Sequence, residues 1–243
     1  PFGSKGQREL YEFSLTLDPT ALANDRTIIT PQELDVTLPQ FNVCLEFNGL
    51  YFHSEIFKSK RYHNEKSIEA AEAGWRLIHI WEDEWREKRA IVESIIRHRC
   101  GLSKVKTSAR KCDIVQLSAQ QRKEFFEANH IDGDVRASNA WGLYDISREK
   151  VVAAISVRKP MHKKWKGALE VARFATITNE SIPGAVGRLH KVVEQHAQSA
   201  GFGSVMTYVD SRFGSIFAAG YEKVGFTLAR QTPPRFWWTD GYN

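Results

Sequence analysis

The sequence predicts an α/β (α+β) chain that folds as two mixed-sheet domains with flanking helices. Hydrophobic patterning is the first observation, because stretches with helical spacing are interleaved with short runs that alternate apolar and polar residues. Size and composition are the second, since 243 residues with 42% hydrophobic and 12% aromatic content exclude global disorder. A short, polar, basic stretch at Ser103–Lys111 is the third, and it indicates a linker. We therefore expect domains at residues 1–103 and 113–243, joined by residues 104–112.

The first half is predicted to alternate helices and strands. Leu10, Phe13 and Leu17 form one apolar stripe at helical spacing, and Gly74 is placed to end a later helix. A Pro-Gln pair between two apolar runs is typical of a tight turn between strands. The predicted elements, in order, are a helix at Gly6–Leu17, strands at Glu33–Leu38 and Phe41–Phe47, a helix from Tyr62 to about Ala73, a strand at Trp75–Trp81, and a helix from Glu82 to about Arg99.

The second half has shorter strands separated by turn signals. Its most informative unit is a strand, then a glycine-containing loop at Ile182–Gly187, then a helix. The predicted elements are a helix at Ser118–Asn129, strands at Trp141–Tyr144, Val151–Val157 and Leu169–Ile177, a helix at Arg188–Ala200, a strand at Val205–Val209, and a last strand ending at Phe236–Trp238. This order predicts a mixed sheet with helices against it.

Two acids stand in the paired strands of the first half. Asp35 alternates with apolar neighbours in the first strand, and Glu46 ends the second. An acid inside a strand is costly unless something pairs with it. Because a turn joins the two strands, the two carboxylates can converge and form an oxygen site for a hard divalent cation, Mg²⁺ or Mn²⁺. The simpler alternatives are a turn-forming Asp and a solvated Glu.

Four motifs surround these acids: ELDV, LEFNGLYFHSE, YHNEK and GWRLIHIWEDEW. Their order and spacing resemble the phage homing-endonuclease branch of the PD-(D/E)XK nucleases, akin to the Vsr repair endonucleases and the EDxHD homing enzymes. The resemblance covers roughly residues 4–102. It implies a mixed sheet flanked by helices and Mg²⁺-dependent hydrolysis of DNA phosphodiesters. In that scheme Asp35, Glu46 and the Phe47 carbonyl hold the metal.

The resemblance also assigns catalytic candidates. His53 follows the second acidic strand and is expected to serve in acid–base chemistry, with His63 and Lys66 as weaker candidates for phosphate or leaving-group contact. Gln7 departs from the family, in which a Glu of the first helix reaches the metal. It indicates natural weakening, an engineered replacement, or an ordinary surface residue. Asn48 stands where many of these nucleases have a Lys, so charge stabilisation has to come from elsewhere.

Positive charge points to a polyanion. The formal net charge is +5 and the isoelectric point is near 9.1, which is compatible with nucleic acid without requiring it. Trp165 lies among the cations of the most basic stretch, a combination that suits a groove or backbone contact. Solvated charge is the alternative. The expected contacts to double-stranded DNA are Arg26, Asn48, Lys58, Lys60, Arg61, Arg158, Lys159, Lys163, Lys164 and Lys166.

A second resemblance covers roughly residues 113–243. The motifs NHIDGD, WGLYD, LEVARF, PGAVGRLHK, TYVDSRFG and YEKVGF resemble the GNAT-like domain fused to phage homing nucleases, and the DNA-modifying Mom proteins are similar too. Backbone N–H groups at Gly184, Ala185 and Gly187 could hold the pyrophosphate of acetyl-CoA, as the GNAT loop does, or a DNA phosphate. They could also form a simple tight turn. The glycine spacing is looser than in GNAT enzymes.

These observations favour a metal-dependent DNA endonuclease whose GNAT-like domain aids DNA recognition. The alternative is a Mom-like DNA-modifying acyltransferase whose nuclease-fold half is an inert DNA-binding module. A DNA-binding regulator without either activity is a third possibility. Three cysteines without a pairing pattern, no signal peptide and no long apolar run predict a cytoplasmic protein, away from membranes. The resemblance implies a phage protein that acts in the bacterial host cell. Monomer and homodimer both remain open.

Overall fold

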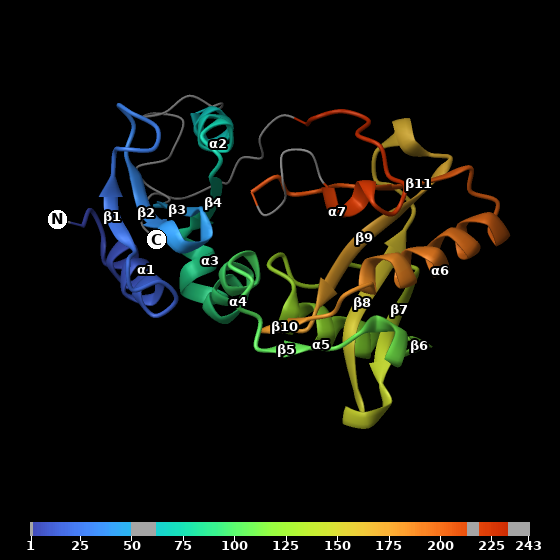
Figure 1. Ribbon diagram of the computed structural model, residues 1–243. Coiled ribbons are helices and arrows are strands. Elements are labelled where there is room, and N and C mark those ends of the chain that lie inside the picture. Colours follow the sequence, from blue (N-terminus) through green and yellow to red (C-terminus); the bar gives the residue numbers. More distant parts are fainter. Residues whose placement is uncertain (1, 50–61, 213–218, 233–243) are drawn as a thin grey trace. The chain divides into compact units, whose positions relative to one another are not determined.

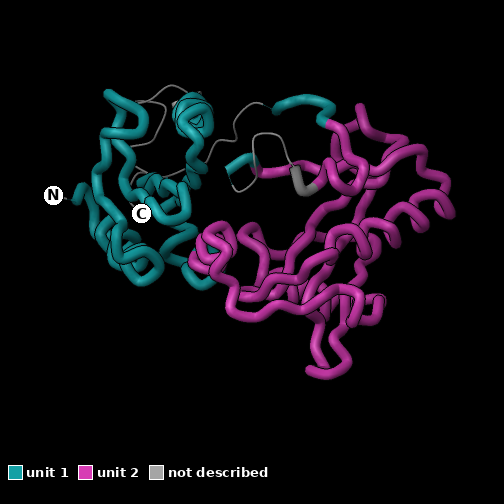
Figure 2. The backbone as a smooth tube through the Cα atoms, in the orientation of Figure 1, with its two compact units in different colours: residues 1–92, 211–217, 228–243 teal, residues 93–210, 218–227 magenta. Residues whose placement is uncertain are grey.

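The computed structural model describes residues 2–49, 62–212 and 219–232 (Figure 1). The chain forms two compact units, shown in Figure 2. Unit 1 comprises residues 1–92, 211–217 and 228–243, and unit 2 comprises residues 93–210 and 218–227. The division falls before the predicted linker, and the chain returns to unit 1 near its end. The predicted strand at Phe236–Trp238 lies outside the described residues.

Unit 1 is built on a four-stranded mixed sheet. The strands are β1 (Leu22–Asp25), β2 (Leu34–Leu38), β3 (Val43–Asn48) and β4 (Arg76–Trp81), in spatial order β1-β2-β3-β4. The first two pairings are antiparallel and β3 pairs with β4 in parallel. A parallel pair needs a crossover, and the crossover segment contains α2 (Tyr62–Glu72). The remaining helices are α1 (Lys5–Leu15), α3 (Glu82–Glu87) and α4 (Arg89–Arg99), the last of which spans the boundary between the units.

Close packing fixes α1 against the centre of this sheet. Every residue of β3 is buried, as expected for a central strand. A Cβ atom added at Gly6 in α1 would overlap the ring of Phe47 in β3, so only glycine allows this approach. Ser4 caps α1 by accepting a hydrogen bond from the Gln7 N–H. Gln7 is therefore held at the helix start, 7% exposed and directed toward the sheet.

Unit 2 is built on a five-stranded sheet in the order β11-β9-β8-β7-β6. The strands β6 (Asp113–Gln116), β7 (Asn139–Asp145), β8 (Lys150–Arg158) and β9 (Ala168–Thr176) form an antiparallel series, and β11 (Ser204–Thr207) pairs with β9 in parallel. The helices are α5 (Ala119–Asn129), α6 (Ala185–Ser199) and the short α7 (Ala219–Glu222). The largest apolar cluster of unit 2 joins α6 to the sheet through buried residues such as Leu189, Val193 and Leu169.

The segment expected as a linker is part of unit 2. Within Ser103–Lys111, β5 (Val105–Lys106) pairs in parallel with β10 (Glu180–Ser181). Ala109 is fully buried, and its N–H donates to the carbonyl oxygen of Pro183. No helix among the described residues is long and apolar enough to cross a membrane. The mixed α/β class is confirmed.

Candidate functional site

In unit 2 the parallel strands β9 and β11 pair over four positions and then separate. The paired positions run from Ser204 opposite Ala168 to Thr207 opposite Val171. The Thr207 hydroxyl donates to the Val171 carbonyl oxygen at 3.1 Å, at the end of the paired stretch. Because β11 ends there and β9 continues to Thr176, the far part of β9 has an open edge in the described part of the chain. Such an edge can pair with an extended ligand as an added strand.

A β-bulge explains where the strands separate. On β8, Ser156 and Val157 are consecutive, but their partners on β9 are Arg173 and Val171, so Ala172 is the extra residue. A bulge bends its strand and increases the local twist. Because Ala172 directly follows the last position paired with β11, the bend coincides with the end of that pairing. The hydrophobic pattern of the sequence carries no signal for it.

The loop after β9 is held rigidly from three sides. The Thr178 N–H donates to the Asn129 side chain at 2.8 Å, and the Asn179 N–H donates to the Ser94 hydroxyl at 2.7 Å. Glu180 accepts from both Arg148 and Lys150, at 2.8 and 3.1 Å. These contacts fix the chain that leads into α6, so the start of the helix is preorganised.

The first turn of α6 presents free backbone N–H groups. Gly184 is the N-cap, has φ of 83°, and offers no side chain to cap the helix. The Ala185 N–H donates to the Ile182 carbonyl oxygen at 3.1 Å. The N–H groups of Val186 and Gly187 have no acceptor among the described residues. A helix start of this kind favours an anion. Of the predicted loop, Gly184 and Gly187 therefore shape the site, while the Ala185 amide is already bonded.

A tyrosine lies against the same half of α6. Tyr221 in α7 packs edge-on against Phe226 at 5.6 Å, and Phe226 stacks on His190 of α6 at 4.6 Å. A Cβ atom at Gly187 would lie 3.7 Å from Val224. Burial raises the pKa of the Tyr221 phenol above its ordinary value, so the hydroxyl stays protonated at neutral pH.

Two of these residues were not predicted as site residues. Tyr221 belongs to the YEKVGF motif, whose Tyr-x3-Gly-Phe spacing was the available signal. His190 is 6% exposed, and its Nδ1 has no hydrogen-bond partner among the described residues. A lone histidine on a helix gives no signal in the sequence.

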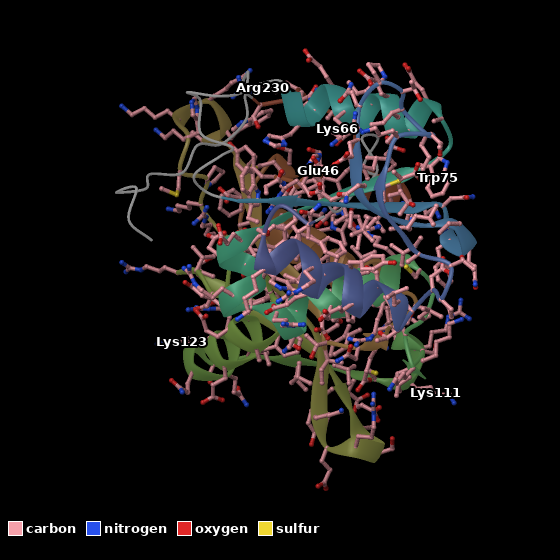
Figure 3. All side chains as sticks on the ribbon, turned by 90° about the vertical axis from the view of Figure 1, so that its left-hand side faces the viewer. Glu46, Lys66, Trp75, Lys111, Lys123 and Arg230 are labelled. Atoms are coloured by element: carbon pink, nitrogen blue, oxygen red, sulfur yellow. The ribbon has the colours of Figure 1, made fainter. Side chains whose placement is uncertain are left out.

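In unit 1, the structure brings together the two acids of the paired strands. Asp35 accepts from the Gln7 amide at 3.1 Å through Oδ1 and from the Phe47 N–H at 2.8 Å through Oδ2. Glu46 accepts from the buried Lys66 ammonium at 2.5 Å, and Figure 3 labels both residues. Burial, and then the charge of Glu46, raise the pKa of Asp35 to about 7.

A neutral polar chain continues from this cluster under α2. The fully buried Asn48 lies 3.3 Å from Nδ1 of His79, whose Nε2 is 2.9 Å from the Ser67 hydroxyl. Burial is the main cause that lowers the pKa of His79 to about 3, so its ring is neutral. The His63 ring packs edge-on against His79 at 5.1 Å. Asn48 is 0% exposed and its amide nitrogen bonds inside the protein, whereas its Oδ1 has no hydrogen-bond partner among the described residues.

The remaining predicted DNA contacts divide into three groups. Lys58, Lys60 and Arg61 lie outside the described residues, as does the catalytic candidate His53. Two arginines are bound to acids: Arg26 to Glu33 at 2.9 Å and Arg158 to Glu170 at 2.6 Å. The lysines of the connection between β8 and β9 are exposed and form no ion pair with a described residue; they are Lys159, Lys163, Lys164 and Lys166.

Comparison with known proteins gives structural likenesses. No family model matches, and no curated protein matches. An aminoglycoside acetyltransferase from an uncultured soil metagenomic sample, in complex with sisomicin, is 14% identical, with a TM-score of 0.39, and the match covers 54% of this chain and 97% of that one. Glucosamine-6-phosphate N-acetyltransferase from Arabidopsis thaliana is 12% identical, with a TM-score of 0.38 and coverage of 51% and 97%. The aminoglycoside N-acetyltransferase AAC(6')-Iy in complex with CoA is 11% identical, with a TM-score of 0.38 and coverage of 53% and 94%.

These findings correct the expectation of a PD-(D/E)XK, metal-dependent endonuclease. The named likenesses are transferases, not nucleases. Where the structure describes the chain, no group of three or more His, Cys, Asp or Glu side chains is arranged to hold a metal ion. The donor set explains why: the Lys66 ammonium supplies the positive charge at Glu46, and both oxygens of Asp35 accept protein donors. The assignment as a hydrolase that uses Mg²⁺ or Mn²⁺ is therefore wrong.

Proposed function

We propose that unit 2 is a GNAT-like acyltransferase that uses acyl-CoA and modifies an amine on DNA. The separation of β9 from β11, together with the open start of α6 in the same unit, is the observation that carries the proposal. It combines an unpaired strand edge with free N–H groups at a rigidly held helix start. An extended chain of amides that ends in a diphosphate fits such a combination.

The residues present fit such a cofactor. The N–H groups of Val186 and Gly187 would hold the diphosphate, and the edge of β9 beyond Val171 would pair with the amides of the pantetheine arm. Gly187 has no side chain to fill the space above the helix start, where the nearest atom to an added Cβ is 3.7 Å away. The bound cofactor would supply an acyl group as a reactive thioester.

Tyr221 is the proposed proton donor. Its raised pKa keeps the phenol protonated, so it can give its proton to the departing sulfur while the acyl carbon bonds to the amine nitrogen. The amine releases a proton to solvent, and the phenol is protonated again from solvent. Contact with Phe226, which in turn stacks on His190, holds the Tyr221 ring beside α6.

DNA as the acceptor is supported by charge rather than by the reaction site. The net charge is +5, and unpaired lysines gather on one connection of unit 2. We propose that unit 1 contributes to DNA binding without chemistry of its own. Its acidic cluster is compatible with that role, because Lys66 neutralises Glu46 and the Gln7 amide is bonded to Asp35.

Transfer of label from radioactive acetyl-CoA to DNA tests the proposal. We expect Tyr221→Phe to abolish label transfer while acetyl-CoA affinity, measured by calorimetry, stays unchanged. Gly187→Glu places a negative charge at the helix start and should abolish affinity, whereas Gln195→Glu, exposed farther along α6, should not.

The outcomes separate the alternatives. Binding of acetyl-CoA with label transfer only to amines other than DNA would refute the DNA acceptor and keep the transferase. Absence of acetyl-CoA binding to the wild-type protein would refute the transferase. Salt-sensitive DNA binding that remained in that case would favour a DNA-binding regulator.

A further inference from the structure

We infer that the connection between β8 and β9, residues 159–167, is an arm that binds the phosphate backbone of nucleic acid. This basic arm joins Arg158, the last residue of β8, to Ala168, the first residue of β9. In Figure 1 it lies at the upper end of the unit 2 sheet. The inference concerns binding and does not depend on acyl transfer.

The arm has a defined fold rather than an irregular path. A 3-10 turn at Lys163–Trp165 is capped by His162, whose Nδ1 accepts from the Lys164 N–H at 3.3 Å. At its base, Arg158 binds Glu170 through two nitrogens, at 2.9 and 2.6 Å. Glu170 is 2% exposed, so this ion pair anchors both strands at the point where the arm leaves the sheet. Arg158 therefore supports the arm and is not counted among its contacts to nucleic acid.

The lysines of the arm face no acid among the described residues, whereas several cations elsewhere in unit 2 form ion pairs. Lys159, Lys163, Lys164 and Lys166 are exposed and make no ion pair with any residue that the structure describes. In contrast, Arg148 and Lys150 bind Glu180, and Arg122 binds Asp134. Four unpaired cations within eight residues of chain fit a ligand with regularly repeated negative charge.

Two side chains of the arm, Trp165 and Met161, help to decide between nucleic acid and a membrane surface. Trp165 is partly exposed, with the Lys164 ammonium 5.5 Å from its ring, so it can stack on a base beside the phosphate contacts. Met161 is 81% exposed at the start of the arm. A membrane surface would need a broader apolar face than these two side chains provide.

The arm is distinct from the start of α6. The arm precedes β9, and the loop leading into α6 follows it, so the nine residues of β9 separate the arm from that loop by about 30 Å along the strand. The open edge of β9 beyond Val171 lies between them.

Fluorescence anisotropy with labelled duplex and single-stranded DNA tests the inference on the full chain, without acyl-CoA. Changing the four arm lysines to Gln should reduce the slope of log affinity against log salt by up to about 3.6 for duplex, at about 0.9 for each phosphate contact. The salt-dependent loss of affinity attributable to the arm, between 50 and 200 mM salt, would then be up to about 100-fold. Trp165→Ala should weaken single strands more than duplex.

A control variant removes the same charge elsewhere on unit 2. It changes four exposed lysines on separate elements to Gln: Lys104, Lys111, Lys123 and Lys191. We expect it to retain the wild-type slope. Equal slopes for the arm variant and the wild type, or equal losses in arm and control variants, would overturn the inference. If the arm variant retained DNA binding, and it alone lost binding to anionic phospholipid vesicles, the arm would be assigned to a membrane surface instead. Because the four ammonium groups make no ion pair with a described residue, thermal unfolding of the arm variant should match the wild type.

Discussion

Asp35→Asn gives the most specific prediction about unit 1. Asp35 is a carboxyl group with an ordinary pKa of 3.8, which burial and the neighbouring charge of Glu46 raise to about 7 in the folded protein. Because the folded-state pKa is the higher one, the protonated carboxyl is favoured by folding. Its contribution to stability is therefore fully present below about pH 4 and is lost as the pH rises through 7.

The size of the effect follows from the two pKa values. A shift of about 3 pH units corresponds to at most about 4 kcal/mol of unfolding free energy, at about 1.4 kcal/mol for each unit. The pKa of about 7 already includes the lowering effect of the Lys66 charge, so we expect up to about 4 kcal/mol between pH 4 and pH 8. The Asn variant loses one of the two hydrogen bonds, because its side chain has a single acceptor oxygen and its amide nitrogen cannot accept from the other donor, Gln7 or Phe47.

The assay is urea unfolding, followed by tryptophan fluorescence, of both proteins at several pH values from 4.5 to 8. The unfolding free energy of the wild type minus that of Asp35→Asn should fall steadily with pH. The control is Asp145→Asn, since hydrogen bonding to Ser147 lowers the pKa of Asp145 to about 2. Its contribution is lost only as the pH falls from about 4 through 2, so its difference from the wild type should stay constant from 4.5 to 8. A wild-type minus Asp35→Asn difference that is flat or rises with pH would refute the electrostatic account of this cluster.

Three further predictions concern packing, the buried ion pair and the proposed acid. Lys66→Met should cost about 3–5 kcal/mol of unfolding free energy, because Glu46 is left charged and buried. The double variant that also carries Glu46→Gln should recover much of this free energy. If the costs of the two single changes, measured by urea unfolding, simply added in the double variant, the pairing of Lys66 with Glu46 would be contradicted. Gly6→Ala should cost about 1–3 kcal/mol through overlap with Phe47, whereas Gly167→Ala, with open space around it, should cost little. Because burial raises the pKa of the Tyr221 phenol above its ordinary value of 10, label transfer by the wild-type protein should not fall through ionisation of this phenol below pH 10; an alkaline loss of rate with an apparent pKa below 10 would contradict Tyr221 as the acid.

Much of unit 1 could be predicted because its signals are local. The turn between β2 and β3 and the alternation around Asp35 placed both acids on neighbouring strands, and the structure brings them together. What could not be predicted is the partner of Glu46. Lys66 reaches it from α2, which lies in the crossover between two parallel strands, and no local pattern reports such a contact. That ammonium changes the chemistry of the cluster from a cation site to an internal ion pair.

Other misses have similar physical causes. The strand β1 was not predicted because Leu22–Asp25 is short and mostly polar, and Asn24 has φ of 55°. The predicted linker contains β5, whose pairing with β10 joins residues far apart in sequence. In unit 2, the strand, loop and helix around Gly184 followed from glycine placement. The bulge at Ala172, which ends the pairing with β11, arises from register between strands and leaves no trace in composition.

Hydrogen exchange with and without acetyl-CoA tests the central claim, that the open edge of β9 and the start of α6 form one cofactor site. The account predicts slower exchange at the amides of Val186 and Gly187 and along β9 after Val171, with no change in β6 at the opposite edge of the sheet. Unchanged exchange at Val186 and Gly187 with saturating acetyl-CoA, or protection confined to other elements, would contradict it.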